Sequence, residues 1–208
     1  MKLKKIINIF KDVIRYIKRL LMFERKYWSK EYDFSKNVAL HEKKVHHEIS
    51  NNCKLGIIEI GVFCGITSKI LSEANPNIPV YGIDPIIPDS MNVKATGNLD
   101  EIKKNTKNCK NYSLIKDYSF NTIKNWNKPF DYLFIDGDHN YVAVKKDYED
   151  WLPKLEKGGT VSFHDSTMNR SNWKYWPGPS KLTDEIIKSD TRVKFIESIG
   201  SLTIFKKI

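Results

Sequence analysis

The sequence has no apolar run long enough to cross a membrane. A membrane-spanning helix needs about 18 or more consecutive apolar residues, and no stretch of this chain approaches that length. Near the start, Lys11, Asp12 and Arg15 interrupt the apolar stretch, and no small-residue cleavage site follows, so the pattern is not that of a signal peptide. We therefore expect neither a membrane-spanning helix nor a secreted protein.

The sequence is also poor in cysteine. Its three cysteines, Cys53, Cys64 and Cys109, stand far apart and lack the spacing of a metal site. An odd number of scattered cysteines excludes a disulfide framework and a zinc ribbon. Free thiols are typical of a reducing compartment, so the sequence predicts a cytoplasmic protein.

Basic charge is concentrated at one end of the chain. The 208 residues contain 35 Lys and Arg against 25 Asp and Glu, a net charge of +10. Residues 1–30 contain ten basic and two acidic residues, a net of +8, which leaves +2 (25 basic, 23 acidic) for the other 178 residues. Binding to nucleic acid needs an extended basic surface. A near-neutral main domain lacks one, so we expect no nucleic-acid partner.

The basic segment has the apolar periodicity of an amphipathic helix. Apolar residues recur every three or four positions at Leu3, Ile7, Phe10, Ile14, Ile17 and Leu21. Such a helix packs on its own domain or on a second copy of the chain, or it lies peripherally on an anionic membrane. The sequence leaves these alternatives open. It predicts a helical arm over residues 1–33 and one domain over residues 34–208.

Beyond the arm, predicted strands and helices alternate. The predicted strands cover residues 55–60, 79–83, 112–116, 131–135, 159–164, 192–196 and 202–205. The predicted helices cover residues 36–50, 66–74, 98–107, 119–126, 141–154 and 180–188. This alternation with short connections predicts an α/β fold, a Rossmann-like doubly wound sheet that is mostly parallel. The last two strands form a C-terminal hairpin, which adds an antiparallel strand.

A glycine-containing loop follows the first predicted strand. In a doubly wound sheet, ligands bind beyond the carboxyl ends of the strands, and here Gly61 and Gly65 allow a close approach of the backbone to a ligand. Their Gly-x-x-x-Gly spacing differs from the G-x-G-x-x-G loop of dinucleotide-binding proteins. Glu59 beside the loop would repel a pyrophosphate, but it suits a ligand with an ammonium or sulfonium group.

Acidic residues also follow the second and third predicted strands. Asp84 stands where a carboxylate accepts hydrogen bonds from the ribose hydroxyls of an adenosine, and Asp117 is placed to face the adenine edge. Each residue alone is better explained as a helix cap or a turn residue. Their occurrence after successive strands favours a nucleoside-binding site.

Further motifs follow the fourth and fifth predicted strands. Phe134-Ile-Asp136-Gly-Asp138-His139-x-Tyr141 comes first, and Gly158-Gly-x-x-x-Phe163-His164-Asp165 follows. Together with Glu59-x-Gly61-x-x-x-Gly65 and Asp84, these motifs resemble the class I S-adenosylmethionine-dependent methyltransferases over about residues 36–208. Within that class, the chain is most similar to small-molecule O-methyltransferases of the methyltransferase domain 24 type, which include macrolide-sugar O-methyltransferases.

The resemblance implies a cofactor and a metal site. Residues along the S-adenosylmethionine cofactor would be Glu59, Gly61, Gly65 and Ser68 for methionine, Asp84 for ribose and Asp117 for adenine. A divalent cation, commonly magnesium, would be held by Asp136, His164 and Asp165. His164 and Ser166 depart from the acidic or amide residues that the family often has there, so manganese, iron or nickel are further candidates.

The chemistry of methyl transfer to oxygen suggests roles for three residues. A hydroxyl becomes a better nucleophile beside a cation or a positioned base. Asp136 and Asp165 end adjacent strands and can converge on one cation, and His139 is our candidate base. The alternatives are a His139 bonded to a local carboxylate and an Asp165 that caps a loop. We expect His41, His46 and His47 to be solvated helix residues.

Aromatic residues are concentrated between residues 172 and 179. Trp173, Tyr175 and Trp176 precede Pro177-Gly178-Pro179. A loop after the fifth strand overhangs the acceptor site, where aromatic faces suit a sugar ring or an apolar acceptor and Gly178 can act as a hinge. A surface flap or a subunit contact explains the same residues.

The sequence therefore predicts an S-adenosylmethionine-dependent O-methyltransferase. Its acceptor would be a hydroxyl of a sugar, glycoconjugate or related small molecule. Two alternatives remain: an NAD(P)-dependent Rossmann-type oxidoreductase, and a protein that binds S-adenosylmethionine without catalysis. A nitrogen acceptor is less favoured, because no Asn/Asp-Pro-Pro-Tyr motif follows the fourth strand.

Overall fold

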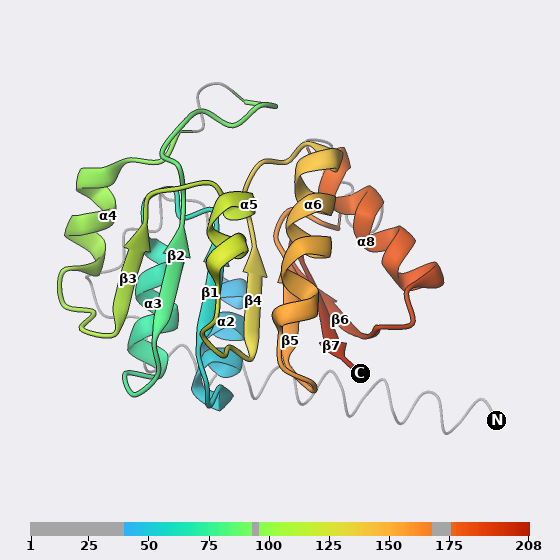
Figure 1. Ribbon diagram of the computed structural model, residues 1–208, viewed down its shortest axis with the longest axis horizontal. Helices are drawn as coiled ribbons and strands as arrows, with labels where there is room; N and C mark the ends of the chain where they lie inside the picture. The colour runs from blue at the N-terminus through green and yellow to red at the C-terminus, as the bar shows by residue number, and fades with distance from the viewer. Residues whose placement is uncertain (1–39, 93–95, 168–175) are drawn as a thin grey trace.

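The computed structural model describes residues 40–92, 96–167 and 176–208, which form three layers of helix, sheet and helix (Figure 1). The predicted arm over residues 1–33 and residues 172–175 of the aromatic segment lie outside the described residues. Within the described residues, no helix has the length and apolar character needed to cross a membrane.

Seven strands form one sheet in the order β3-β2-β1-β4-β5-β7-β6. They are β1 (Ile57–Ile60), β2 (Val80–Ile83), β3 (Tyr112–Ile115), β4 (Tyr132–Ile135), β5 (Thr160–Phe163), β6 (Val193–Ile199) and β7 (Leu202–Lys207). Strands β1 to β5 are parallel, whereas β7 is antiparallel to both β5 and β6. The predicted Rossmann-like, mostly parallel sheet with a C-terminal antiparallel hairpin is confirmed.

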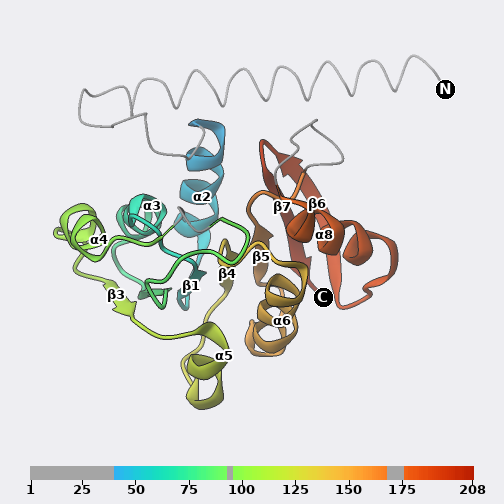
Figure 2. The same ribbon diagram turned by 90° about the horizontal axis from the view of Figure 1, so that it is seen from above.

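Helices cover both faces of this sheet (Figure 2). The helices on one face are α2 (Leu40–Asn52), α3 (Ile66–Ala74) and α4 (Leu99–Thr106). The other face carries α5 (Ser119–Thr122) and α6 (Tyr141–Trp151), and α8 (Pro177–Ser189) packs against α6. Short 3₁₀ turns, Ile123–Asn125 and Leu152–Lys154, continue α5 and α6.

The two faces of the sheet are both apolar. Ile58 and Ile60 of β1 pack in a cluster with Trp151 of α6, whereas Ile57 packs in a second cluster with Leu71 of α3. Successive side chains of a strand point to opposite faces. This explains why β1, β4 and β5 are buried at every position and why most of their residues are apolar, apart from Glu59, Thr160 and Ser162.

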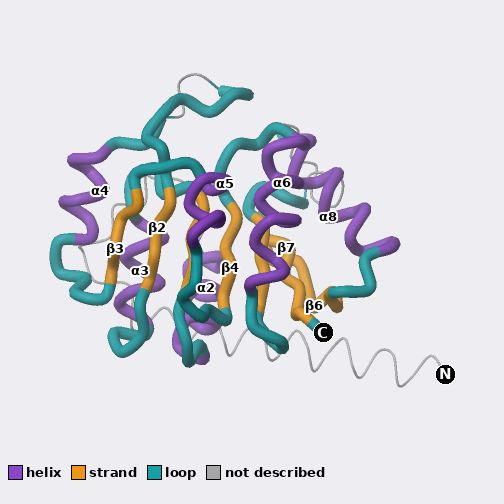
Figure 3. Tube along the Cα trace, viewed as in Figure 1, coloured by secondary structure: helices purple, strands orange, loops and turns teal. Residues whose placement is uncertain are grey.

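The register of the parallel strands places their carboxyl ends at one edge. Ile60 of β1 lies opposite Ile83 of β2 and Ile135 of β4, and Phe163 of β5 lies opposite Ile135. Figure 3 shows the loops that follow the strands along this upper edge of the sheet. The polar residues that follow each strand are therefore brought together there.

Candidate active site

A cavity of about 1520 Å³ opens at the carboxyl ends of the parallel strands. Its polar lining residues include Glu42, Glu59, Asp84, Asp89, Ser119, Asp136, His139, Asp147, His164, Asp165 and Ser201. Ligand pockets commonly have volumes of about 300–1,000 Å³. The cavity is thus large enough for a nucleoside cofactor and a second small molecule together.

The glycine loop begins at the end of β1 and leads into α3. Gly61 has a φ of 87°, and a Cβ atom there would lie 2.0 Å from the backbone oxygen of Asp136. Gly65 has a φ of 78° and occupies the N-cap of α3. Both glycines have left-handed conformations that L side chains rarely adopt. Gly61 brings the backbone of the loop close to the end of β4, and Gly65 brings it close to Ile102 of α4.

Glu59 is the last polar residue of β1 and is almost fully buried. It accepts a hydrogen bond from the Ser68 hydroxyl, while its Oε1 atom makes no hydrogen bond within the described residues. Burial raises the pKa of Glu59 well above its usual value, against the effect of the Ser68 hydrogen bond. Ser68 and Gly65 are not among the cavity-lining residues. Ser68 therefore does not line the cavity itself but holds the Glu59 carboxyl group that does.

Asp84 connects the loops that follow β1 and β2. Its Oδ2 atom accepts hydrogen bonds from the backbone N–H groups of Val62 (2.9 Å) and Phe63 (3.0 Å), and Oδ1 accepts one from Ile86 (2.7 Å). Phe63 and Ile86 have positive φ angles of 55° and 60°. Such angles are unfavourable for side chains of this size. The Asp84 carboxylate thus holds both loops in their strained conformations.

Asp117 lies two residues before α5 and does not line the cavity. Its Oδ1 atom accepts hydrogen bonds from the backbone N–H of Tyr118 (2.7 Å) and from Nδ2 of Asn121 (3.2 Å). The next three residues, Tyr118, Ser119 and Phe120, line the cavity in its place.

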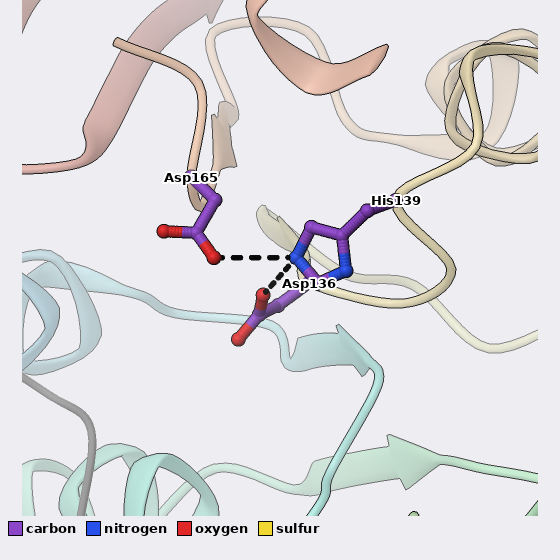
Figure 4. A group of neighbouring side chains, drawn as sticks. All are labelled: Asp136, His139 and Asp165. Carbon is purple, nitrogen blue, oxygen red and sulfur yellow. Dashed lines mark ion pairs between the residues drawn. The ribbon is translucent and has the colours of Figure 1, made fainter. Parts of the chain in front are cut away.

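Asp136, His139 and Asp165 converge at the ends of β4 and β5 (Figure 4). One potential ligand atom from each of the three residues lies within 4.8 Å of the others. Nε2 of His139 lies 3.3 Å from Oδ2 of Asp165 and 3.7 Å from Oδ1 of Asp136. Two carboxylates and an imidazole at these separations have the composition of a divalent-cation site.

His139 is fixed on its other side by residues distant in the sequence. Its Nδ1 atom lies 2.7 Å from Oδ2 of Asp89, and its ring stacks on Trp176 with centroids 4.2 Å apart. Burial alone would lower the pKa of His139, but the carboxylates of Asp165, Asp136 and Asp89 raise it to about 9. The imidazole is therefore protonated at neutral pH in the absence of a bound cation.

His164 lies between two carboxylates. Its Nδ1 atom is 3.0 Å from Oδ1 of Asp136, and its Nε2 atom is 3.5 Å from Oε2 of Glu42. Burial would lower the pKa of His164, but Asp136 and Glu42 raise it well above its usual value. Burial would raise the pKa of Glu42, but His164 and Ser201 lower it to about 2. Both groups are thus charged and form a buried ion pair beside the Asp136 carboxylate.

Two sequence-based expectations outside this cluster are wrong. His46 is fully buried instead of solvated, lies 2.9 Å from the Tyr132 hydroxyl through Nδ1, and has a pKa lowered by burial to about 3. Gly178 is not a hinge in a loop. It is buried in the first turn of α8, where a Cβ atom would lie 2.2 Å from the backbone oxygen of His139.

Similar solved structures share this fold. TomG, an O-methyltransferase from Streptomyces achromogenes solved with S-adenosylmethionine, has a TM-score of 0.61 and 14% identity over 82% of this chain and 81% of that chain. A putative caffeoyl-CoA O-methyltransferase from Staphylococcus aureus has a TM-score of 0.63 and 19% identity over 98% of both chains. PaMTH1 from Podospora anserina, bound to S-adenosylhomocysteine, has a TM-score of 0.64 and 15% identity over 92% of this chain and 87% of that chain.

Sequence comparison identifies the family. The uncharacterized protein R132 of Acanthamoeba polyphaga mimivirus is 27% identical over 183 residues, which is 81% of this chain and 78% of that protein. A family model described as a methyltransferase domain matches residues 58–166, more than half of the chain. The resemblance to class I S-adenosylmethionine-dependent methyltransferases is confirmed, and the chain belongs to this methyltransferase domain family.

Proposed function

We propose that the protein transfers a methyl group from S-adenosylmethionine to a hydroxyl of a sugar or related small molecule, assisted by a divalent cation. The observation that carries this proposal is the convergence of Asp136, His139 and Asp165 in the same cavity as the glycine loop. A cofactor in the loop and an acceptor at this cluster would share one space.

The cavity residues fit the cofactor. Gly61 lets the loop backbone lie directly against the Asp136 backbone at the cavity. The unpartnered Oε1 of Glu59 offers an acceptor for an ammonium group. Asp84 stands at the end of β2, one strand further along, where the ribose would lie. S-adenosylmethionine supplies an electrophilic methyl group on a sulfonium sulfur. TomG and PaMTH1, solved with S-adenosylmethionine and S-adenosylhomocysteine, support the assignment by analogy.

The acidic cluster fits a divalent cation. Asp136, Asp165 and Nε2 of His139 would hold it, while Asp89 orients the ring through Nδ1, as carboxylates commonly orient metal-bound histidines. A cation there supplies positive charge that favours the deprotonated form of an acceptor hydroxyl.

This arrangement changes the role that the sequence suggests for His139 and His164. A general base must be neutral, whereas His139 has a pKa of about 9 among three carboxylates. We therefore assign His139 to cation binding in place of His164, whose nitrogens face Asp136 and Glu42. Trp176 stacks on His139 and lines the cavity, and its apolar surface suits the C–H face of a sugar ring.

Calorimetric titration with S-adenosylmethionine, S-adenosylhomocysteine and NAD tests the cofactor. We expect micromolar binding of both S-adenosyl ligands and none of NAD. Methyl transfer to a panel of free and nucleotide-linked sugars, with Mg²⁺, with Mn²⁺ and with a chelator, then tests acceptor and metal. The His139→Ala variant should retain S-adenosylhomocysteine affinity and lose turnover. Absence of binding by either S-adenosyl ligand would overturn the proposal.

A further inference from the structure

A buried carboxyl group in the wall of the cavity has no part in the arrangement described so far. Asp147 lies on α6, is 7% exposed and lines the cavity. Its Oδ1 atom accepts a hydrogen bond from the hydroxyl of Ser119 on α5. No described residue donates a hydrogen bond to its Oδ2 atom, which is not among the sealed, unpartnered atoms of the core and so keeps some accessible surface. One oxygen is thus fixed by α5, and the other is free to accept a hydrogen bond from a ligand.

The buried position of Asp147 is costly for an ionised carboxyl group. Burial raises the pKa of Asp147 to about 7, against the effect of the Ser119 hydrogen bond. Burial of a carboxyl group with one unpartnered oxygen costs free energy that a leucine or alanine would not cost. A binding role explains why an acid stands here.

The order of the strands indicates which part of the cofactor lies nearby. Glu59 is the last residue but one of β1, and Asp84 follows β2. Ser119 comes four residues after the end of β3, the outermost strand on this side. If methionine lies over β1 and ribose over β2, as proposed above, the base lies toward β3 and α5. Ser119 and Asp147 are at this end of the cavity.

The side chains around this end suit a flat aromatic base. Tyr118 and Phe120 line the cavity, are 41% and 37% exposed, and stack on each other with centroids 4.9 Å apart. Val142 of α6 lines it too and is 71% exposed. Large apolar side chains left exposed at a cavity mark a ligand surface. The polar residues beside them are Ser119, Asp147 and Lys146, and Lys146 pairs with Asp150.

We infer that Asp147 is a specificity-determining residue whose Oδ2 accepts a hydrogen bond from the 6-amino group of the cofactor's adenine, with Ser119 holding the carboxyl group in place. The inference rests on the proposed function. A hypoxanthine base carries a carbonyl oxygen at this position, so two acceptors would face each other. The site should therefore reject it.

The test compares S-adenosylhomocysteine with S-inosylhomocysteine by calorimetry at about pH 8, where the carboxyl group is mostly ionised. We expect the wild-type protein to bind S-adenosylhomocysteine at least about tenfold more tightly. In Asp147→Asn, the side-chain amide can donate to the hypoxanthine oxygen. This variant should bind S-inosylhomocysteine several-fold more tightly than the wild type does, and a gain of affinity cannot result from misfolding.

The matched control is Asp150→Asn. Asp150 lies on the same helix, pairs with Lys146 at 2.8 Å and is not among the cavity-lining residues. This control should keep the wild-type preference. Equal affinities of the wild type for the two ligands, or an Asp147→Asn variant with the wild-type preference, would overturn the inference and leave the proposed function intact. A wild type that binds neither ligand would overturn both.

Discussion

Asp84 has a structural task besides its proposed contact with ribose. Replacement by alanine leaves the N–H groups of Val62, Phe63 and Ile86 without their acceptor. We expect Asp84→Ala to lower the free energy of unfolding by about 2–4 kcal/mol and to abolish S-adenosylhomocysteine binding, because the glycine loop loses its conformation. Urea denaturation and calorimetry measure the two effects.

Asp117→Ala provides the contrast. Its carboxylate accepts hydrogen bonds from Tyr118 and Asn121 and is absent from the cavity lining. Its loss should cost about 1 kcal/mol of stability and change cofactor affinity less than about threefold. A loss of affinity as large as that of Asp84→Ala would restore the adenine contact that the sequence suggests for Asp117.

Asp89 should act on the cation site without contact to the cation. The Asp89→Asn variant keeps an oxygen for the backbone N–H groups of Met91 and Asn92 but weakens the bond that orients His139. We expect about 10–100-fold weaker binding of Mn²⁺ with unchanged S-adenosylhomocysteine affinity, both measured by calorimetry. Unchanged Mn²⁺ affinity would contradict the assignment of His139 as a ligand.

The sequence reveals some of these residues and not others for a physical reason. Asp136, His139 and Asp165 follow predicted strands, and the geometry of a parallel sheet brings strand ends together. Glu42, Asp89 and Asp147 instead reach the cavity from a helix, a loop and another helix. Their roles depend on partners that only the folded chain brings near, such as His164 for Glu42 and Ser119 for Asp147.

At the scale of elements, Gly61 determines how closely the glycine loop approaches β4. A methyl group at Gly61 would lie 2.0 Å from the Asp136 oxygen and 2.7 Å from the Gly137 nitrogen, both backbone atoms that cannot move cheaply. We expect Gly61→Ala to lower the free energy of unfolding by at least about 3 kcal/mol and to abolish cofactor binding. Denaturation and calorimetry check both.

Gly158→Ala separates the contact from the backbone strain. Gly158 has a φ of 75°, close to that of Gly61, but a Cβ atom there would have nothing within 4 Å. We therefore expect Gly158→Ala to lower the free energy of unfolding by only the backbone strain, about 1–2 kcal/mol, and to leave cofactor affinity normal. Similar losses in the two variants would show that φ alone, and not the approach to Asp136, determines the effect.

Within the described residues, the predicted strands and helices match the structure apart from their ends. The helix predicted over residues 180–188 begins at Pro177, since proline is well tolerated in the first turn. The last strands extend further than predicted, to Ile199 and Lys207, because their pairing in a hairpin sustains residues whose own β preference is weak, such as Lys206 and Lys207. Local patterns determine the type of an element better than its limits.

At the scale of the whole molecule, the sequence predicts the class of fold but not the strand order. Alternating strands and helices require a doubly wound sheet, yet they leave open whether β6 or β7 joins β5. The structure inserts β7, whose first four residues, Leu202–Phe205, are buried, between β5 and β6, whose residues are mostly exposed. The more apolar strand of the hairpin takes the inner position. The basic arm, with its alternatives of self-association and membrane contact, stays a prediction.

The stability of the whole molecule should depend on pH through Asp147. Its pKa is raised from 3.8 to about 7 in the folded protein, so between these values the folded state binds more protons than the unfolded state. Stability therefore falls as pH rises through this window and is constant above it. The loss amounts to about 4 kcal/mol at most. The Asp147→Asn variant has no carboxyl group at this position and does not show this loss. Its free energy of unfolding relative to that of the wild type should therefore increase from about pH 4 to pH 7.

Urea denaturation of the two proteins at several pH values measures that difference. Other shifted groups, including Glu59 and His139, are present in both proteins and cancel in the comparison. Asp150→Asn should change stability by less than about 1 kcal/mol at every pH, because its surface ion pair with Lys146 contributes little. A difference between Asp147→Asn and wild type that stays flat from pH 4 to pH 7 would mean that the carboxyl group titrates normally and is hydrated in the folded protein. In that case Asp147 would already be satisfied by water, and its burial would give no reason to expect a ligand there.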